Sequence, residues 1–306
     1  MPIPVAHSIL RTLAYFELFQ HPLTAQELHF YLDQPVDETV MQSALQQLLQ
    51  EHRLIIHSGY YYLQNQPSVV ERRKQYNAHA KELLPVAHRI GKLLSCFPYV
   101  SGVCISGSLS KEVAAKDADL DFFIITKPGR LWIARTCMHL LKKMSFLVGK
   151  QHWFCMNYYV DESTPLIRER NYFTAIEMLT LMPVAGSDAL PHFFHANEWV
   201  HHYLPAYAGK ELPPIKRKDG LLKKAVEWIF SHRYGDRLET FLMHITTKRW
   251  KLKENSYQLN MKGGRMGLDA GRHYCKPNPV HFQEPLLERY QKRVSDLLEQ
   301  PYVMVS

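Results

Sequence analysis

The chain of 306 residues lacks any uninterrupted apolar run of about 18 residues, so the sequence predicts no membrane-spanning helix. Its start lacks the basic residues and the apolar run of a signal peptide. Paired cysteines are lacking too, because the five cysteines are scattered and none forms a Cys-x-x-Cys pair. We therefore expect no disulfide framework, no zinc site and no membrane partner, and we predict a cytoplasmic protein.

Positive charge is scarce in the first part of the chain. Residues 1–65 contain two Lys or Arg against six Asp or Glu, a net charge of −4. Residues 210–306 contain 19 Lys or Arg against 11 Asp or Glu, a net charge of +8. The whole chain carries +8, which leaves +4 for residues 66–209. A nucleic acid or a polyphosphate would be drawn to the second and third parts and repelled by the first.

The first 65 residues have the pattern of three helices followed by a hairpin. Thr24 and Glu27 form a capping-box sequence at the start of the second helix. The hairpin is indicated by two apolar runs joined through His57-Ser58-Gly59. This order resembles a winged helix-turn-helix. The expected helices cover 4–20, 24–32 and 37–52, and the expected strands cover 54–56 and 60–63.

The third of these helices does not have the surface of a DNA-reading helix. Such a helix ordinarily brings Lys or Arg to phosphates and guanines. Here nothing basic occurs before Arg53, in a part of the chain that is acidic overall. We therefore expect residues 1–65 to pack against the protein or a protein partner, and we do not expect them to bind DNA. The exposed side chains of the helix would be Glu38, Thr39, Gln42, Gln46, Gln47, Gln50 and Glu51.

The remaining chain divides into two further predicted parts. In residues 66–165, a long leading helix precedes apolar strands that alternate with an amphipathic helix, which is typical of an α/β or α+β core. Residues 166–306 read as mainly helical, with a loop-rich stretch over 255–280. In the middle part, the helices are expected at 68–97 and 130–148, and the strands at 103–105, 120–125 and 153–160.

Two short motifs of the middle part carry the chemistry. An apolar strand ends in Gly107-Ser108, where glycine lets the backbone approach a phosphate and serine offers its N–H and its hydroxyl. The next strand opens with Asp119-Leu120-Asp121. Strand geometry places Asp119 and Asp121 on one face, about 6–7 Å apart, which suits shared binding of a hard divalent cation.

Gly-Ser followed by this acidic pair, on a strand that continues as Phe-Phe-Ile-Ile, resembles the polymerase-β-type nucleotidyltransferase superfamily. The nearest in style are its antibiotic-modifying and minimal bacterial members. The resemblance covers about residues 101–160. It implies that Gly107 and Ser108 hold a nucleoside triphosphate and that Asp119 and Asp121 bind Mg²⁺ or Mn²⁺. The fold it implies is a small mixed-sheet core, here between a winged-helix-like domain and a helical C-terminal region.

The chain departs from the family pattern at two positions. Many members have a second glycine four residues after the serine, where this chain has Glu112. A third carboxylate usually lies on the following strand, where the best match is Asn157. An amide can bind a metal through its oxygen but cannot act as a base. Asp161 and Glu177 remain as candidates for the missing acid, although Glu177 could equally be a buried structural carboxylate paired with an arginine.

The sequence therefore predicts a nucleotidyltransferase that moves a nucleoside monophosphate from an NTP to an acceptor hydroxyl and releases pyrophosphate. ATP is the expected donor, and residues 166–306 would provide the acceptor pocket. Asp119, Asp121 and Glu177 would be the catalytic residues. The acceptor could be a small molecule, a protein side chain or an RNA end. In the alternative interpretation, the loss of the third acid leaves a nucleotide-binding regulatory or scaffold protein with weakened or no catalysis.

Overall fold

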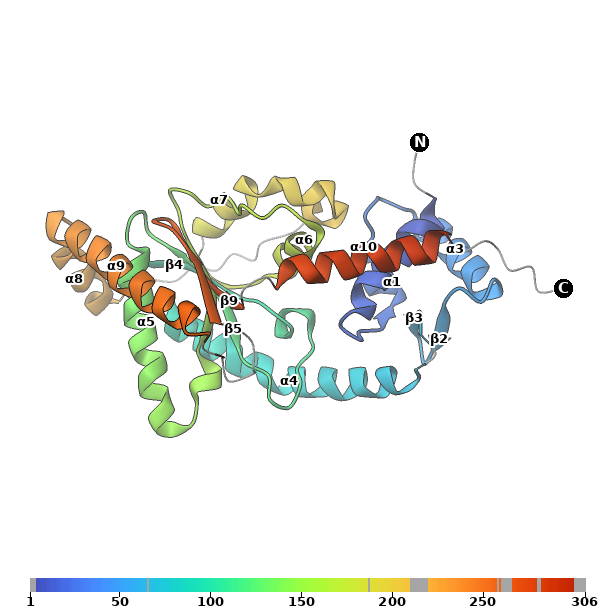
Figure 1. Ribbon diagram of the computed structural model, residues 1–306, viewed down its shortest axis with the longest axis horizontal. Helices are drawn as coiled ribbons and strands as arrows, with labels where there is room; N and C mark the ends of the chain where they lie inside the picture. Colours follow the sequence, from blue (N-terminus) through green and yellow to red (C-terminus); the bar gives the residue numbers. More distant parts are fainter. Residues whose placement is uncertain are drawn as a thin grey trace.

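The computed structural model describes residues 4–64, 66–186, 188–209, 220–257, 259, 266–279 and 282–299. These residues form a mixed α+β structure around a six-stranded sheet, with a second, three-stranded sheet in the N-terminal part (Figure 1). The α+β class agrees with the prediction. Within the described ranges, no helix is both long enough and apolar enough to span a bilayer.

The N-terminal part has the predicted order of three helices and a hairpin. Its elements are α1 Val5–Glu17, β1 Leu23–Thr24, α2 Ala25–Phe30, α3 Glu38–Gln50, β2 Ile55–His57 and β3 Tyr60–Tyr62. The capping box is present, because the Thr24 side chain accepts a hydrogen bond from the Glu27 N–H and the Glu27 carboxylate accepts one from the Thr24 N–H. Strand β1, which the sequence did not reveal, pairs with β3 on the side opposite to β2.

The middle part supplies the three strands at the centre of the large sheet. Its elements are α4 Ser68–Leu94, β4 Val100–Ile105, β5 Asp121–Thr126, α5 Leu131–Ser145 and β6 Cys155–Asp161. Strands β4 and β5 are antiparallel, whereas β5 and β6 are parallel and are joined through α5. The end of β4 therefore lies at the same edge of the sheet as the starts of β5 and β6.

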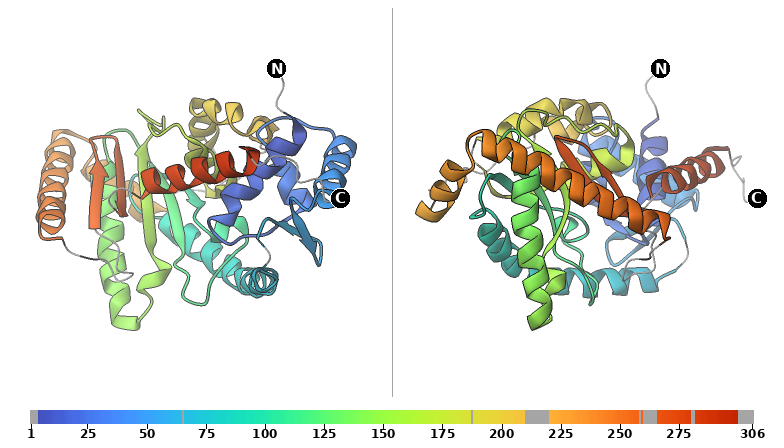
Figure 2. Two further views of the ribbon diagram at one scale, coloured as in Figure 1. Left: turned by 45° about the vertical axis from the view of Figure 1, so that its right-hand side comes forward. Right: turned by 60° about the vertical axis from the view of Figure 1, so that its left-hand side comes forward.

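The C-terminal part contains more strand than the sequence predicted. Its elements are α6 Tyr172–Thr180, β7 Met182–Ala185, α7 Ala189–Ala196, α8 Leu221–Ile229, α9 Arg233–Asn255, β8 Met266–Ala270, β9 Tyr274–Pro279 and α10 Gln283–Glu299. Strands β7, β8 and β9 extend the sheet to the order β7-β4-β5-β6-β9-β8 (Figure 2). The prediction of loop over 255–280 was wrong for the hairpin β8–β9, whose prolines lie in the part of β9 beyond its pairing with β6, where their missing N–H breaks no bond to that strand.

Helices cover both faces of the sheet because β5 is apolar on both of its faces. Phe122 and Ile124 belong to a core shared with α4 and α5, and α9 packs against it. Phe123 and Ile125 point the other way, into a core shared with α6 and α7. This second core continues without interruption into the helices of the N-terminal part.

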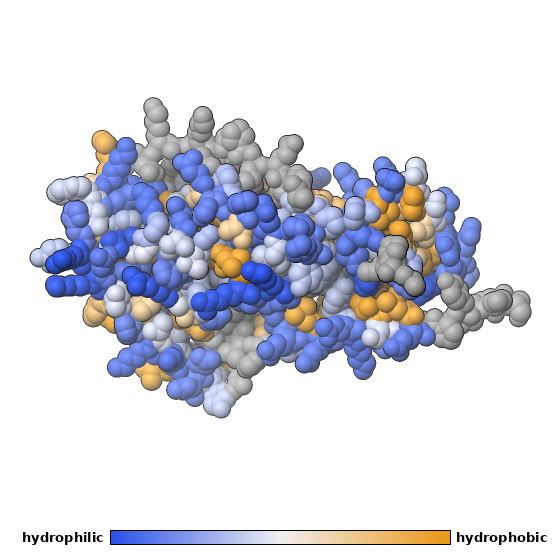
Figure 3. Space-filling model, turned by 90° about the horizontal axis from the view of Figure 1, so that it is seen from above, coloured by the Kyte–Doolittle hydropathy of each residue, from blue (hydrophilic) through white to orange (hydrophobic). Residues whose placement is uncertain are grey.

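The two ends of the described chain meet, since α10 packs along α1 (Figure 1). The Tyr290 ring of α10 stacks on Tyr172 of α6 with centroids 5.4 Å apart, and the Tyr15 ring of α1 packs edge-on against Tyr172 at 5.0 Å. Arg293 of α10 also forms an ion pair with Glu17 at 2.6 Å. These contacts fix the N-terminal part against the large sheet. Seen from above, the surface is mostly hydrophilic, with hydrophobic residues gathered at the N-terminal end (Figure 3).

A buried carboxylate joins α9 to α5. Glu239 accepts hydrogen bonds from the backbone N–H groups of Trp132 and Ile133, at 2.6 and 2.9 Å, in the first turn of α5. These N–H groups have no partner within the helix, so Glu239 stabilises the helix start. Burial nevertheless raises the pKa of Glu239 from 4.5 to about 6.

We expect this raised pKa to appear in the pH dependence of stability. The folded protein binds the Glu239 proton more tightly than the unfolded chain, so protonation of Glu239 stabilises the folded state. This contribution is complete below pH 4.5 and is lost as the pH rises through 6. The loss amounts to about 2 kcal/mol for a pKa raised from 4.5 to about 6. Glu239→Gln cannot titrate. As the pH rises across this range, the unfolding free energy of wild type, measured with urea, should therefore fall by that amount relative to that of the variant. A difference independent of pH would contradict the assignment.

Candidate functional site

The Gly-Ser turn and the acidic pair meet at one edge of the large sheet. Ile105, the last residue of β4, pairs with Phe122 of β5, so the residues that follow β4 lie against the start of β5. The Ser106 N–H donates to the carbonyl of Asp121 at 2.9 Å and closes this corner. The carbonyl of Leu120 accepts from the Cys155 N–H at 3.2 Å, which brings the start of β6 to the same edge.

Gly107 is required at this corner by both its backbone conformation and its surroundings. Its φ of +68° lies in the left-handed region, which residues with a Cβ atom rarely adopt. A Cβ atom at Gly107 would lie 2.4 Å from Oδ2 of Asp121. The glycine therefore lets the Asp121 carboxylate reach the turn. The Asp121 carboxylate also lies near the Cys155 thiol. Burial and the negative charge of Asp121 raise the pKa of this thiol to about 12, so it stays protonated.

His152 holds the other member of the acidic pair. Its Nδ1 lies 2.7 Å from Oδ1 of Asp119, just before β5 begins. His152 belongs to the short 3-10 helix η3 Gln151–Trp153, which directly precedes β6. Because β5 and β6 are parallel, residues just before each strand are neighbours. The sequence prediction missed His152. The available signal was its position directly before the strand expected at 153–160.

Asn157 lies on β6 at a bulge. The register of β6 against β5 shifts there, since Met156 pairs with Phe122 and Tyr158 pairs with Phe123. Asn157 is the extra residue, and the Ser106 hydroxyl donates to its Oδ1 at 3.3 Å. Bulges re-aim side chains and are frequent beside functional sites. The amide thus contacts the Gly-Ser corner, where the family pattern would place a third carboxylate.

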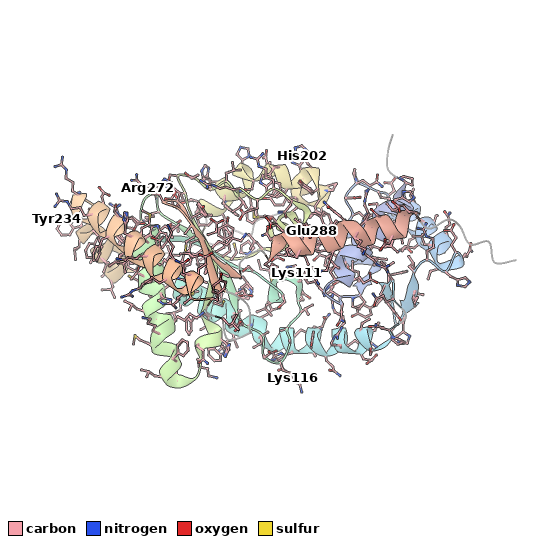
Figure 4. The ribbon with its side chains drawn as sticks, viewed as in Figure 1. Lys111, Lys116, His202, Tyr234, Arg272 and Glu288 are labelled. Carbon is pink, nitrogen blue, oxygen red and sulfur yellow. The ribbon has the colours of Figure 1, made fainter. Side chains whose placement is uncertain are left out.

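Glu177 reaches the corner from α6 through a lysine. Lys111 lies in the short 3-10 helix η1 Leu109–Lys111, and its Nζ is 2.8 Å from Oε1 of Glu177 and 3.0 Å from the carbonyl of Gly107. Figure 4 shows Lys111 inside the molecule between α4 and α10, whereas Lys116 of the same loop points outward. The partner of Glu177 is therefore a lysine and not an arginine. Sequence reasoning missed Lys111, a basic residue three places after Ser108.

Glu112, which occupies the position of the family's second glycine, adopts a glycine-like backbone. Its φ and ψ are +56° and +35°, in the left-handed region. Its N–H donates to the carbonyl of Leu109 at 3.0 Å and ends η1. The loop thus bends as a glycine would allow, although it carries a side chain that makes this conformation less favourable.

All six residues expected to form the site line one cleft of about 750 Å³. This size is typical of small-molecule sites. The N-terminal part contributes to its wall through Phe16 and Phe19, α4 contributes through Arg72, and α10 contributes through Gln283. The expected site residues in the lining are Gly107, Ser108, Asp119, Asp121, Asn157 and Glu177.

Asp161 does not belong to the cleft, so it cannot be the third acid. It pairs with Thr126 at the far end of β5 from Asp121, about 17 Å along the strand for five residues. Its side chain is fully buried and accepts hydrogen bonds from the backbone N–H groups of Gly129 and Ser163, with His273 Nδ1 at 2.8 Å. These contacts give Asp161 a structural role. Glu177 remains as the candidate acid.

The donor set at this edge fits a hard divalent cation. Carboxylate and amide oxygens of Asp119, Asp121 and Asn157 are the ligand types that Mg²⁺ and Mn²⁺ favour. Among the described residues, no group of three or more His, Cys, Asp or Glu side chains is placed to hold a metal ion. Magnesium commonly binds through one or two carboxylates and completes its shell with water and substrate phosphates. The pair therefore suits a cation that arrives with a phosphate ligand.

The requirement for glycine at position 107 can be tested against a matched glycine. Gly129 has a similar φ of +63°, but a Cβ atom there would meet nothing within 4 Å. We expect Gly129→Ala to lower the unfolding free energy by about 1 kcal/mol through its backbone conformation. Gly107→Ala should cost about 1 kcal/mol more, because Asp121 must leave its rotamer. Equal losses in urea denaturation would mean that Asp121 yields without cost.

Comparison of the chain with protein-family models, with curated proteins and with solved structures finds no match in any of the three.

Proposed function

We propose that the protein is a metal-dependent nucleotidyltransferase, with ATP as the expected donor. The observation that carries this proposal is the convergence of Gly107-Ser108, the acidic pair and Asn157 on one edge of the sheet, within a single cleft. The acceptor hydroxyl would attack the α-phosphorus of the nucleotide. Its new O–P bond would form as the bond to the β-phosphate breaks, and pyrophosphate would leave.

The residues of the cleft divide this work. The Gly107 backbone and the Ser108 hydroxyl would hold the triphosphate, together with the ammonium of Lys111. Asp119 and Asp121 would hold Mg²⁺ or Mn²⁺, which supplies charge neutralisation on the phosphates. His152 orients Asp119 through its 2.7 Å contact, and Gly107 leaves room for Asp121.

Glu177 is the candidate for the general base. In the structure its carboxylate is paired with Lys111. A triphosphate that drew Lys111 to its oxygens would release Glu177 to take the proton of the acceptor hydroxyl. The ion pair would thus keep the base neutralised until the donor is bound.

The amide side chain of Asn157 supports a second candidate function, which is nucleotide binding without catalysis. Asn157 stands beside Ser106 where the family pattern has a carboxylate, and an amide provides no negative charge and no basicity. If Glu177 does not replace that carboxylate, the protein would bind a nucleotide without turnover and act as a regulator or scaffold. The two candidates make opposite predictions for Glu177 variants.

The N-terminal part is proposed to shape the cleft and not to bind DNA. The exposed face of α3 carries Gln, Glu, Thr and Ser with Val40 and has no basic residue, and the Gln47 side chain is hydrogen-bonded to Glu51 at 2.7 Å. Arg53, the first basic residue after the helix, donates to the carbonyl of Leu297 in α10. These contacts support a packing role, in which Phe16 and Phe19 line the cleft.

The metal assignment predicts that Asp121→Asn lowers the Mg²⁺-dependent affinity for ATP at least about tenfold, since one anionic ligand is lost. Asp117→Asn is the matched control, because Asp117 lines the same cleft from the preceding loop and its affinity should stay within about twofold of wild type. Isothermal titration with ATP in Mg²⁺ and in EDTA gives both values. Equal affinity of wild type and Asp121→Asn in Mg²⁺ would remove the basis of the proposal.

The choice between an enzyme and a binding protein is tested at Asn157 and Glu177. Asn157→Asp should leave nucleotide binding intact and raise the rate of pyrophosphate release, because it restores a metal-binding carboxylate. Glu177→Gln should lower any wild-type rate by about 10²–10⁴-fold, the usual worth of a general base. Pyrophosphate release is measured with each of the four NTPs in Mg²⁺ or Mn²⁺. A robust wild-type rate that Glu177→Gln leaves unchanged would show that another group is the base.

A further inference from the structure

The far end of α5 exposes a cluster of large apolar side chains. We call residues 140–150 the α5 tip; it includes the last turn of α5 and the 3-10 helix η2 Phe146–Val148. Its end projects from the body of the molecule in three views (Figures 1 and 2). Five apolar side chains of the tip are at least half exposed: Leu140 55%, Met144 65%, Phe146 52%, Leu147 88% and Val148 69%. Contiguous exposed apolar side chains of this kind mark an interaction surface.

The segment that carries the tip has charged residues of one sign only. Between Asp121 and Asp161 the sequence contains no Asp or Glu. Lys143 and Lys150 are exposed on the tip, and Lys142 is half-buried beside them. The Lys150 ammonium lies 4.2 Å from the ring centroid of Trp153 at the base of the tip. The tip therefore combines exposed aliphatic and aromatic side chains with lysines and has no acidic residue of its own.

This combination selects among the classes of partner. A symmetric contact between two tips would bring their lysines together, and like charges across an interface disfavour association. Binding to nucleic acid depends mainly on basic side chains, and the tip has three lysines against five exposed apolar side chains. An anionic bilayer accommodates both, since apolar groups enter the boundary between headgroups and acyl chains while lysines contact lipid phosphates.

We propose that the α5 tip attaches the protein reversibly to an anionic membrane surface. This goes beyond the sequence, which predicted no membrane partner because it has no spanning segment. Surface attachment requires only a few exposed apolar side chains beside lysines. The proposal is independent of the nucleotidyltransferase assignment, because none of the tip residues lines the cleft.

The test is flotation of the full-length protein with vesicles of phosphatidylcholine alone and of phosphatidylcholine mixed with phosphatidylglycerol. Wild type should bind the mixed vesicles at low salt and should bind the neutral vesicles far more weakly. The double variant Leu147→Glu, Val148→Glu should bind the mixed vesicles at least about tenfold more weakly. Val40→Glu is the control, since Val40 is 48% exposed on α3 at the other end of the molecule. It should bind as wild type does.

A second variant keeps the test independent of any folding defect. Lys143→Gln with Lys150→Gln leaves the apolar residues in place and should weaken binding to the mixed vesicles by about fivefold for each lysine. Absence of wild-type binding to the mixed vesicles would overturn the proposal. It would equally be overturned if the Leu147→Glu, Val148→Glu variant bound the vesicles normally, or if that variant instead abolished a dimer or the binding of nucleic acid.

Discussion

The site depends on the close approach of a backbone and a carboxylate at the corner where β4 ends and β5 begins. Gly107 turns with a φ of +68°, and a Cβ atom there would collide with Asp121. The antiparallel pairing of β4 with β5 sets this approach, and the parallel pairing of β5 with β6 adds Asn157 and His152 to the same edge. Any residue other than glycine would push the Asp121 carboxylate away from the turn.

The cleft above this corner exists because the two ends of the chain are held together. Tyr15, Tyr172 and Tyr290 come from α1, α6 and α10, and their rings pack against one another. Burial also raises the pKa of Tyr172 well above its ordinary value, so its hydroxyl stays neutral. The aromatic packing places α1 against α6, which carries Glu177. The N-terminal part thereby becomes a wall of the site, in keeping with the proposed packing role.

The sequence predicted the parts of the site that are local in the chain. Gly107-Ser108 and Asp119-x-Asp121 are short motifs whose geometry follows from a turn and a strand. The contacts of Lys111 with Glu177 and of His152 with Asp119 join segments 66 and 33 residues apart, and no short pattern encodes them. Asp161 was a wrong candidate for the third acid. It is only four residues from Asn157 in the sequence, but β6 places it at the opposite end of the strands from Asp121.

The edge hairpin β8–β9 shows a second limit of pattern reading. Its glycines and prolines have the composition of a loop, and the pairing of Tyr159 with Cys275 and of Val160 with Tyr274 makes the segment part of the sheet. The contribution of Phe16 and Phe19 to the cleft was equally hidden, because it depends on how α1 packs against α6 and α10. Long-range packing, and not local propensity, decided each of these outcomes.

The central claim is that the acidic pair and the Gly-Ser turn together receive a metal-bound nucleoside triphosphate. The most direct measurement is a crystal structure of the protein with Mg²⁺ and a non-hydrolysable ATP analogue. The account predicts a metal ion coordinated by Asp119 and Asp121, with the phosphates over Gly107 and Ser108. An analogue bound elsewhere, or a metal–phosphate complex at this edge that neither carboxylate touches, would contradict it.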